Sequence, residues 1–229
     1  MTVRRSNQRW RRAIDAVALT LSVGLAAGGC NKDLAALGGS PSLTPATTSG
    51  SYQLPLDSVP SSDGSTFYFT AMSTSGSMGV FSVPAAGGAA TQLFAGAPLS
   101  SPFGIAISSD DKTLFIADSG AGYDPNNPGT GAEPDMLGQV LSMPTAGGTP
   151  VALTGTTGFR PKGIEVFRKD NADTIYFSGY NASDGKAGVF SVGPDGGGLT
   201  PLTTGGPLTD PGGVTVARDG TVYVVNTTA

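Results

Sequence analysis

Outside its first thirty residues, this 229-residue chain gathers its apolar residues in short runs without the period of an amphipathic helix. One run begins with threonine and occurs four times, with its threonines spaced by 47, 61 and 47 residues. The four copies span residues 66–71, 113–118, 174–179 and 221–226. Short runs rich in β-branched and aromatic side chains are typical of buried strands. The pattern therefore predicts a repeat built from strands.

A second phrase is interleaved with the first and ends in a pair of glycines. It is an apolar run with a central serine and a short turn, at residues 79–88, 138–148 and 188–197. Adjacent glycines supply the positive φ that tight hairpin turns require. In the second repeat the two phrases predict strands at 103–108, 113–118, 138–143 and 149–154. Each repeat is thus expected to form one four-stranded antiparallel sheet.

Stacked sheets of a strand-rich repeat form the blades of a β-propeller. The predicted fold class is all-β, a partial propeller of about 3.5 four-stranded antiparallel blades. The blades are expected at approximately 52–98, 102–157, 161–207 and, incomplete, 211–229. Closed propellers typically have about four to eight blades, so three interpretations stay open. The chain is a piece of a longer reading frame, it closes by self-association, or it closes irregularly as one small domain.

The first thirty residues have the three parts of a secretory signal. Five arginines and no acidic residue lie within 1–12, an apolar run spans 16–27, and two glycines precede Cys30. The apolar run is shorter than the about 20 residues that a membrane-spanning helix needs. Arg4 and Arg5 also suit twin-arginine export, but the polar residues after them lack the apolar character of that signal.

The end of this signal, residues 25–30, resembles the lipobox of bacterial lipoproteins, with Ala27 where leucine is usual. The resemblance implies a signal peptide over 1–29 and lipidation of Cys30, which becomes the new N-terminus. It also favours the outer membrane, because Asn31 is not the aspartate that keeps many such lipoproteins at the inner membrane. The alternative for Cys30, the single cysteine of the chain, is a small buried thiol.

Residues 30–50 combine this cysteine with a stretch rich in Ser, Thr, Gly and Pro that has no aromatic residue. Such a composition buries too little apolar surface to offset the entropy of ordering. It predicts a disordered linker that joins the lipid to the propeller repeats of 51–229. The expected organisation is an anchor, a tether and one repeat domain.

The chain is acidic, and the imbalance grows once the signal is set aside. The full sequence has 13 basic and 17 acidic residues, and residues 1–30 contain five of the basic residues and one of the acids. An acidic surface argues against nucleic acid as a partner. The lack of histidine and the single cysteine remove the commonest general base and thiolate chemistry. No catalytic residue is therefore predicted.

Two segments, residues 102–120 and 211–226, carry a resemblance to known propellers. Each has a proline and glycine, an apolar strand, a turn with aspartate and the threonine-led strand. They resemble NHL-type repeats and the gluconolactonase/regucalcin propellers, and the resemblance covers most of 52–226. It implies a propeller fold, in a group that includes sugar lactonases and modules that bind proteins or carbohydrate.

The lactonase-like members of this group hold a divalent metal at their central opening with Glu, Asn and Asp side chains. The matching candidates are Asp118 and Asn226 at the ends of the threonine-led strands, with Asn181 just beyond a third such strand, and Ca²⁺ is the implied cofactor. These donors are fewer than the about six to eight oxygens that Ca²⁺ takes. The alternative is that Asp118 and Asn226 cap turns.

The loop between residues 118 and 138 is longer than its counterparts in the other repeats. It offers the hard oxygen donors Asp124, Asn126, Glu133 and Asp135. Because long loops on rigid scaffolds often carry function, one expectation is a Ca²⁺ or ligand site. The other is a solvated surface loop.

These features together predict a cell-envelope lipoprotein whose propeller binds a protein, a glycan or a small molecule and whose lipid ties it to the membrane. The alternative is a metal-dependent, Ca²⁺-type lactonase-like hydrolase. Binding is favoured because the sequence has a tether and a scaffold without a catalytic set. The aromatic residues of the repeated strands are expected in the core rather than as sugar platforms: Phe67, Tyr68, Phe115, Tyr176 and Tyr223.

Overall fold

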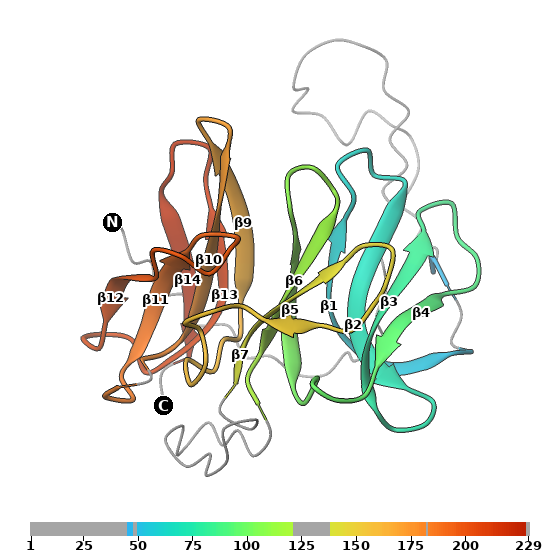
Figure 1. Cartoon of the computed structure of the whole chain (residues 1–229), viewed down its shortest axis with the longest axis horizontal. Helices are drawn as coiled ribbons and strands as arrows, with labels where there is room; N and C mark the ends of the chain where they lie inside the picture. Colours follow the sequence, from blue (N-terminus) through green and yellow to red (C-terminus); the bar gives the residue numbers. More distant parts are fainter. Residues whose placement is uncertain (1–44, 48–49, 121–137, 182, 228–229) are drawn as a thin grey trace, which may run out of the picture.

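The computed structural model describes residues 45–47, 50–120, 138–181 and 183–227. Within these ranges the chain consists of strands and turns, so no helix there is long and apolar enough to cross a bilayer. Four antiparallel sheets follow one another along the chain (Figure 1). The all-β class predicted from the sequence is confirmed.

Three of the sheets have four strands each, paired in chain order, and the last has two. The first contains β1 (Tyr52–Pro60), β2 (Thr66–Ser73), β3 (Met78–Pro84) and β4 (Thr91–Ala95). The second contains β5 (Pro102–Ile107), β6 (Thr113–Asp118), β7 (Gln139–Pro144) and β8 (Val151–Ala152). The third contains β9 (Ile164–Lys169), β10 (Ala172–Tyr180), β11 (Ala187–Val192) and β12 (Thr200–Thr204). The fourth contains β13 (Asp210–Val216) and β14 (Val222–Thr227).

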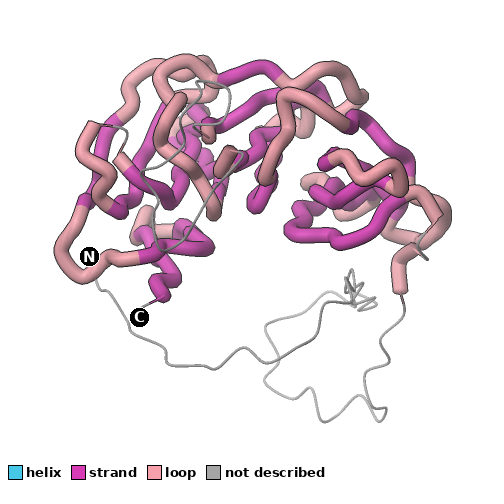
Figure 2. Tube along the Cα trace, turned by 90° about the horizontal axis from the view of Figure 1, so that it is seen from below, coloured by secondary structure: helices cyan, strands magenta, loops and turns pink. Residues whose placement is uncertain are grey.

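The sheets stand side by side like the blades of a propeller and form an arc (Figure 2). The first strand of each sheet lies on the inner side, where β1, β5, β9 and β13 together line one cavity. The fourth strands lie at the opposite edge of their sheets. This radial arrangement confirms the predicted partial propeller.

Apolar side chains are buried mainly between successive sheets. Val80 and Ile116 lie in the core between the first and second sheets, and Phe115 and Phe190 lie in the core between the second and third. Val214 packs with residues of the third sheet. Full burial of one such side chain contributes about 1.5–3 kcal/mol relative to exposure. The contacts between sheets therefore hold the arc together.

Alternate residues of a second strand face opposite neighbours, as the pleat of a strand requires. On β6, Leu114 and Ile116 belong to the core shared with the first sheet. Phe115 and Ala117 belong to the core shared with the third sheet and are 1% and 0% exposed. Burial on both faces explains why the threonine-led runs are apolar throughout rather than alternating.

The inner strands approach one another most closely at a glycine that recurs in the repeat. A Cβ atom at Gly104 would lie 2.5 Å from the carbonyl oxygen of Lys162, in the segment that enters β9 of the third sheet. A Cβ atom at Gly163 would lie 2.4 Å from the carbonyl oxygen of Gly212 in the fourth. Close approach of the main chains thus requires glycine at these two positions.

The free face of the first sheet is covered by its own N-terminal segment. The Tyr52 and Phe69 rings meet edge to face at 4.8 Å, and Phe69 stacks on Phe81 at 5.5 Å. Ala46 is buried, and its carbonyl oxygen accepts a hydrogen bond from the Gly88 N–H at 3.0 Å. Ala46 belongs to the predicted linker 30–50, so the end of that segment packs on the first sheet.

Two strands are shorter than their sequence patterns predict. β8 contains Val151 and Ala152 alone, instead of the expected 149–154. It begins directly after Pro150, which has no N–H to donate to a strand ladder. β9 begins at Ile164 instead of residue 161, just beyond the close approach to the fourth sheet at Gly163.

Candidate functional site

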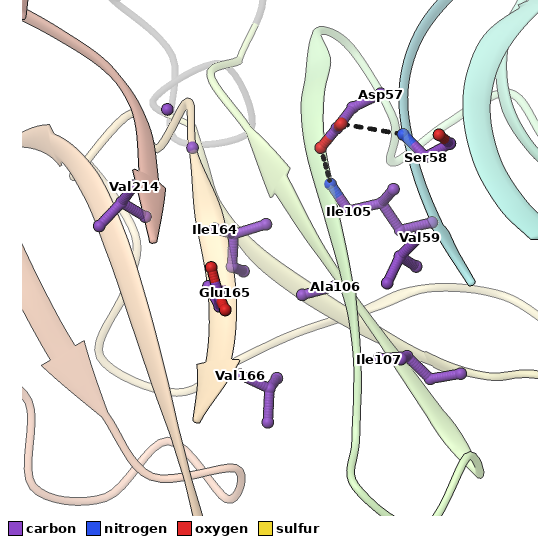
Figure 3. Close-up of a pocket in the computed structure, with 12 residues that line it drawn as sticks. Asp57, Ser58, Val59, Ile105, Ala106, Ile107, Ile164, Glu165, Val166 and Val214 are labelled. Atoms are coloured by element: carbon purple, nitrogen blue, oxygen red, sulfur yellow. Dashed lines mark hydrogen bonds between the residues drawn. The ribbon is translucent and has the colours of Figure 1, made fainter. Parts of the chain in front are cut away.

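A cavity of about 420 Å³ lies at the centre of the arc, among the inner strands of all four sheets (Figure 3). Its volume falls within the roughly 300–1,000 Å³ of small-molecule sites. Most lining residues are aliphatic or glycine, and two are acidic, Asp57 on β1 and Glu165 on β9. These two side chains are the charged acceptors of the cavity wall.

Asp57 reaches from the first sheet to the second. Its Oδ2 accepts the main-chain N–H of Ile105 at 3.0 Å, and its Oδ1 accepts that of Ser58 at 2.9 Å (Figure 3). The Ile105 N–H is therefore directed away from β6, the strand with which β5 pairs. The carboxylate thus gives an N–H group on the inner edge of β5 a hydrogen-bond partner. It also links the first and second sheets at the cavity wall.

An irregularity of β1 accompanies this placement. Between Gln53 and Asp57 the pairing of β1 with β2 shifts register, so that residues 54–56 form a bulge. Leu54 has a φ of 48°, in the left-handed region that disfavours a side chain. Strain of this kind costs about 1–3 kcal/mol and tends to occur at functional sites.

The pairing registers show that Asp57 stands where the other three sheets have glycine. Ser58, the residue after Asp57, faces Phe69, the fourth residue of its threonine-led strand. In the other sheets, the residue that follows Gly104, Gly163 or Gly213 faces the fourth residue of its own threonine-led strand in the same way. Gly104 and Gly163 admit a main-chain carbonyl group of the next sheet. In the first sheet, the Asp57 carboxylate occupies the corresponding place, so the cavity wall carries a polar group there.

The surroundings of Asp57 raise its pKa above the ordinary value. The residue is solvent-exposed, but protein atoms crowd around its carboxylate at the concave wall and remove part of its hydration. This loss disfavours the charged form and outweighs the hydrogen bonds from the N–H groups of Ile105 and Ser58, which lower the pKa. The loss of hydration at the carboxylate is the larger effect, so the pKa of Asp57 is raised.

Glu165 is the second acidic residue of the cavity. It lies on β9 between Ile164 and Val166 and is half-buried. A carboxyl group so placed accepts hydrogen bonds from a ligand, and the aliphatic residues beside it supply apolar contact. The site thus combines two acceptors with a wall that presents both polar and apolar surface.

The sequence-based interpretation did not single out Asp57 or Glu165. Asp57 lies in the least regular repeat, where the bulge hides its correspondence to glycine. Glu165 interrupts an apolar inner strand, which is the signal that points to it in hindsight. Only the structure, in which the inner strands of the four sheets surround one cavity, shows that both residues line the same site.

Asp118, a predicted metal ligand, is a buried residue with 2% exposure at the end of β6. Its Oδ2 accepts the N–H of Ser100 at 2.7 Å, and its Oδ1 accepts the N–H groups of Ser101 at 2.9 Å and Gly120 at 2.8 Å. Burial raises the pKa of this carboxyl group, and the three hydrogen bonds lower it by less. The side chain thus joins the end of β6 to the segment that enters β5.

Asn226 performs the same task in the fourth sheet. Its Oδ1 accepts the N–H groups of Thr209 at 3.0 Å and Asp210 at 3.2 Å, and its Nδ2 donates to the carbonyl oxygen of Pro207 at 3.1 Å. The shared geometry of Asp118 and Asn226 is that of a side chain that fixes a loop.

Asn181, the third predicted ligand, stabilises a turn between β10 and β11. Its Oδ1 accepts the N–H of Ser183 at 3.0 Å and lies 2.9 Å from the hydroxyl group of Ser183. Over the described ranges, no group of three or more acidic or cysteine side chains is placed to hold a metal ion. Metal binding by Asp118, Asn226 and Asn181 stays a prediction.

The remaining candidates lie outside the described residues. They are Cys30 and the four loop residues Asp124, Asn126, Glu133 and Asp135. Lipidation of Cys30 and a ligand site in the loop therefore also stay predictions.

Comparisons with known proteins identify the fold. No protein-family model and no curated protein matches the chain. A gluconolactonase from Xanthomonas campestris superimposes with a TM-score of 0.57 at 16% identity, over 80% of this chain and 58% of that one. A chain of a nidogen/laminin complex gives 0.54 at 20% identity, over 73% and 54%. A periplasmic gluconolactonase from Pseudomonas aeruginosa gives 0.50 at 14% identity, over 80% and 53%.

The chain spans between 53% and 58% of the length of these three structures. Their names cover binding proteins as well as lactonases, so the likeness does not select an activity. At these identities it shows the architecture alone, and the chain is a β-propeller protein.

Proposed function

We propose that the chain is a ligand-binding module whose central cavity holds a small polar molecule rich in N–H or O–H groups. The observation that carries this proposal is the convergence of four inner strands on one cavity with two acidic side chains, Asp57 and Glu165. Carboxyl groups in a cavity wall select donors and cations and disfavour anions.

The positioning of Asp57 adds support. Its two hydrogen bonds to main-chain N–H groups hold the carboxylate in place before a ligand arrives. A carboxylate oxygen has more than one lone pair, so each oxygen accepts a further hydrogen bond from a ligand. A preorganised acceptor loses little side-chain entropy on binding, which favours affinity.

Size-matched sugars that differ in charge test this proposal. We expect the melting temperature to rise most with glucosamine, less with glucose and not with gluconate, because the site favours donors and cations. Asp57→Asn and Glu165→Gln should each weaken binding about tenfold, which corresponds to about 1.4 kcal/mol. Asp170→Asn removes the same charge from the turn between β9 and β10 and serves as the matched control. Equal binding of gluconate contradicts the proposal.

The rival function, a metal-dependent lactonase, makes a different prediction. It requires Asp118, Asn226 and Asn181 to serve a metal, whereas their side-chain oxygens hold loop and turn groups. We expect millimolar Ca²⁺ to leave the melting temperature unchanged and the chain to leave gluconolactone unhydrolysed. A Ca²⁺-dependent activity that is lost in Asp118→Asn favours the lactonase and contradicts the binding role.

We also propose that the module is a lipid-anchored protein of the bacterial cell envelope, at the outer membrane. Support comes from the lipobox-like residues 25–30 and the single cysteine, Cys30. The likeness to a periplasmic propeller is compatible with this location. In a bacterial host, metabolic labelling with an alkyne fatty acid should mark the wild-type chain and not Cys30→Ser. A labelled Cys30→Ser chain, or an unlabelled wild type with residues 1–29 intact, contradicts lipidation.

A further inference from the structure

A buried arginine lies where the second and third sheets meet, in the segment that enters β9. A Cβ atom at Gly138, next to β7, would lie 2.8 Å from the Cα atom of Arg160. Arg160 is 3% exposed, and over the described residues its buried Nη1 has no hydrogen-bond partner. Lys162, two residues further on, is paired with Asp210. A charge removed from water destabilises the fold unless an opposite charge pairs with it.

The main chain forms a bulge at Arg160. After β6, the Ser119 N–H donates to the carbonyl oxygen of Ser101, the residue directly before the proline of β5. At the same place of the third sheet, the Tyr180 N–H donates to Phe159, which lies one residue further from its proline. Arg160 is therefore an extra residue in this ladder, and its φ of 47° lies in the left-handed region. Bulges and strain of this kind re-aim side chains and recur at functional sites.

The residues on both sides of Arg160 are fixed by contacts. The Pro161 carbonyl oxygen accepts the Ser119 hydroxyl group at 2.6 Å, and the Phe159 carbonyl oxygen accepts the Tyr180 N–H at 2.7 Å. The Phe159 ring also packs edge to face on that of Phe190, at 4.9 Å. The arginine is thus held in place by its neighbours. A donor that is positioned in advance loses little entropy when a ligand binds to it.

We propose that Arg160 binds a small oxyanion, a carboxylate of formate's size, between the second and third sheets. A guanidinium group presents parallel N–H donors that match the two oxygens of a carboxylate. The anion supplies Nη1 with an acceptor and pairs the buried charge. Because the side chain is almost fully enclosed, the anion has to be small. Gluconate is too large for this site, so the test of the central cavity is independent of it.

The test replaces chloride by formate, up to tens of millimolar, at constant ionic strength. Chloride is a single atom and cannot accept two parallel N–H groups with separate oxygens. We expect formate to raise the melting temperature of the whole chain in a saturable way, since a ligand of the folded state stabilises it. Arg160→Met should lose this rise. Arg218→Met removes an exposed guanidinium group from the turn between β13 and β14, and it should keep the rise.

Arg160→Lys separates the shape of the donor from its charge. It retains the positive charge and lacks the planar fork, so formate should bind at least tenfold more weakly than to wild type. Equal binding of formate to wild type and Arg160→Lys overturns the proposal. So does a rise in melting temperature that is as large in Arg160→Met as in wild type.

Nuclear magnetic resonance of the wild-type chain with ¹⁵N-labelled arginine tests the site without any substitution. Formate should shift the guanidinium signals of Arg160 and leave those of the more exposed Arg168 and Arg218 in place. If Arg160→Met does not fold, this measurement decides by itself. Guanidinium signals that all stay unchanged, or that shift equally with chloride, overturn the proposal.

Discussion

Asp118 shows at the residue scale how a buried carboxylate organises a loop. Three main-chain N–H groups converge on its two oxygens, at distances between 2.7 and 2.9 Å. Deletion of such an acceptor leaves buried donors unpaired, at about 1–3 kcal/mol for each group. Its hydrogen bonds with main-chain N–H groups therefore account for the aspartate at the end of β6.

The pH dependence of folding should reveal Asp118. Its folded-state pKa lies above the ordinary 3.8, so the folded state binds the proton more tightly than the unfolded state. The free energy of unfolding should consequently fall as the pH rises from 3.8 to the raised pKa, and level off above it. Urea unfolding of wild type and Asp118→Asn between pH 3 and 7 measures this contribution. In Asp118→Asn the amide does not titrate and contributes a constant amount to the free energy of unfolding. The part of the pH slope that is due to Asp118 should therefore be missing in this variant. If the free energy of unfolding of wild type minus that of Asp118→Asn increases with pH, the upward shift of the Asp118 pKa is contradicted.

At the scale of elements, the threonine-led runs predicted the second strands well because those strands are buried on both faces. The expected strand 113–118 coincides with β6. Inner strands were harder to predict, because their ends depend on contacts with the next sheet. The bulge before Asp57 and the late start of β9 both arise there. The cavity escaped prediction for the same reason, since Asp57 and Glu165 line it together only through the arrangement of the sheets.

The recurring glycine of the inner strand allows a matched test of sheet packing. Gly163→Ala places a Cβ atom 2.4 Å from the Gly212 carbonyl oxygen, so the third and fourth sheets must separate. We expect the free energy of unfolding to fall by about 1–3 kcal/mol. Gly213→Ala is the control at the same repeat position, since no atom lies within 4 Å of its Cβ. It should change stability by less than about 0.5 kcal/mol. Equal effects of the two substitutions in urea unfolding contradict this account of the packing.

On the scale of the whole molecule, the four sheets make an arc that is different at its two ends. The first sheet is covered by Tyr52 and Ala46. The last sheet exposes Tyr223 and Val225, although Tyr223 was expected in the core with the other strand aromatics. That expectation was wrong because, among the described residues, nothing covers this face of β14, whereas Tyr52 and Ala46 cover the free face of the first sheet.

The aromatic cover of the first sheet has a consequence for biogenesis. During synthesis the chain emerges N-terminus first, so Tyr52, at the start of β1, appears ahead of the rest of the first sheet. Once β1 to β4 are out, Tyr52 can close over Phe69 and Phe81 without any later part of the chain. The first sheet thereby covers its own apolar face while the rest of the chain is still being synthesised. Each later sheet can then pack against a sheet that has already folded.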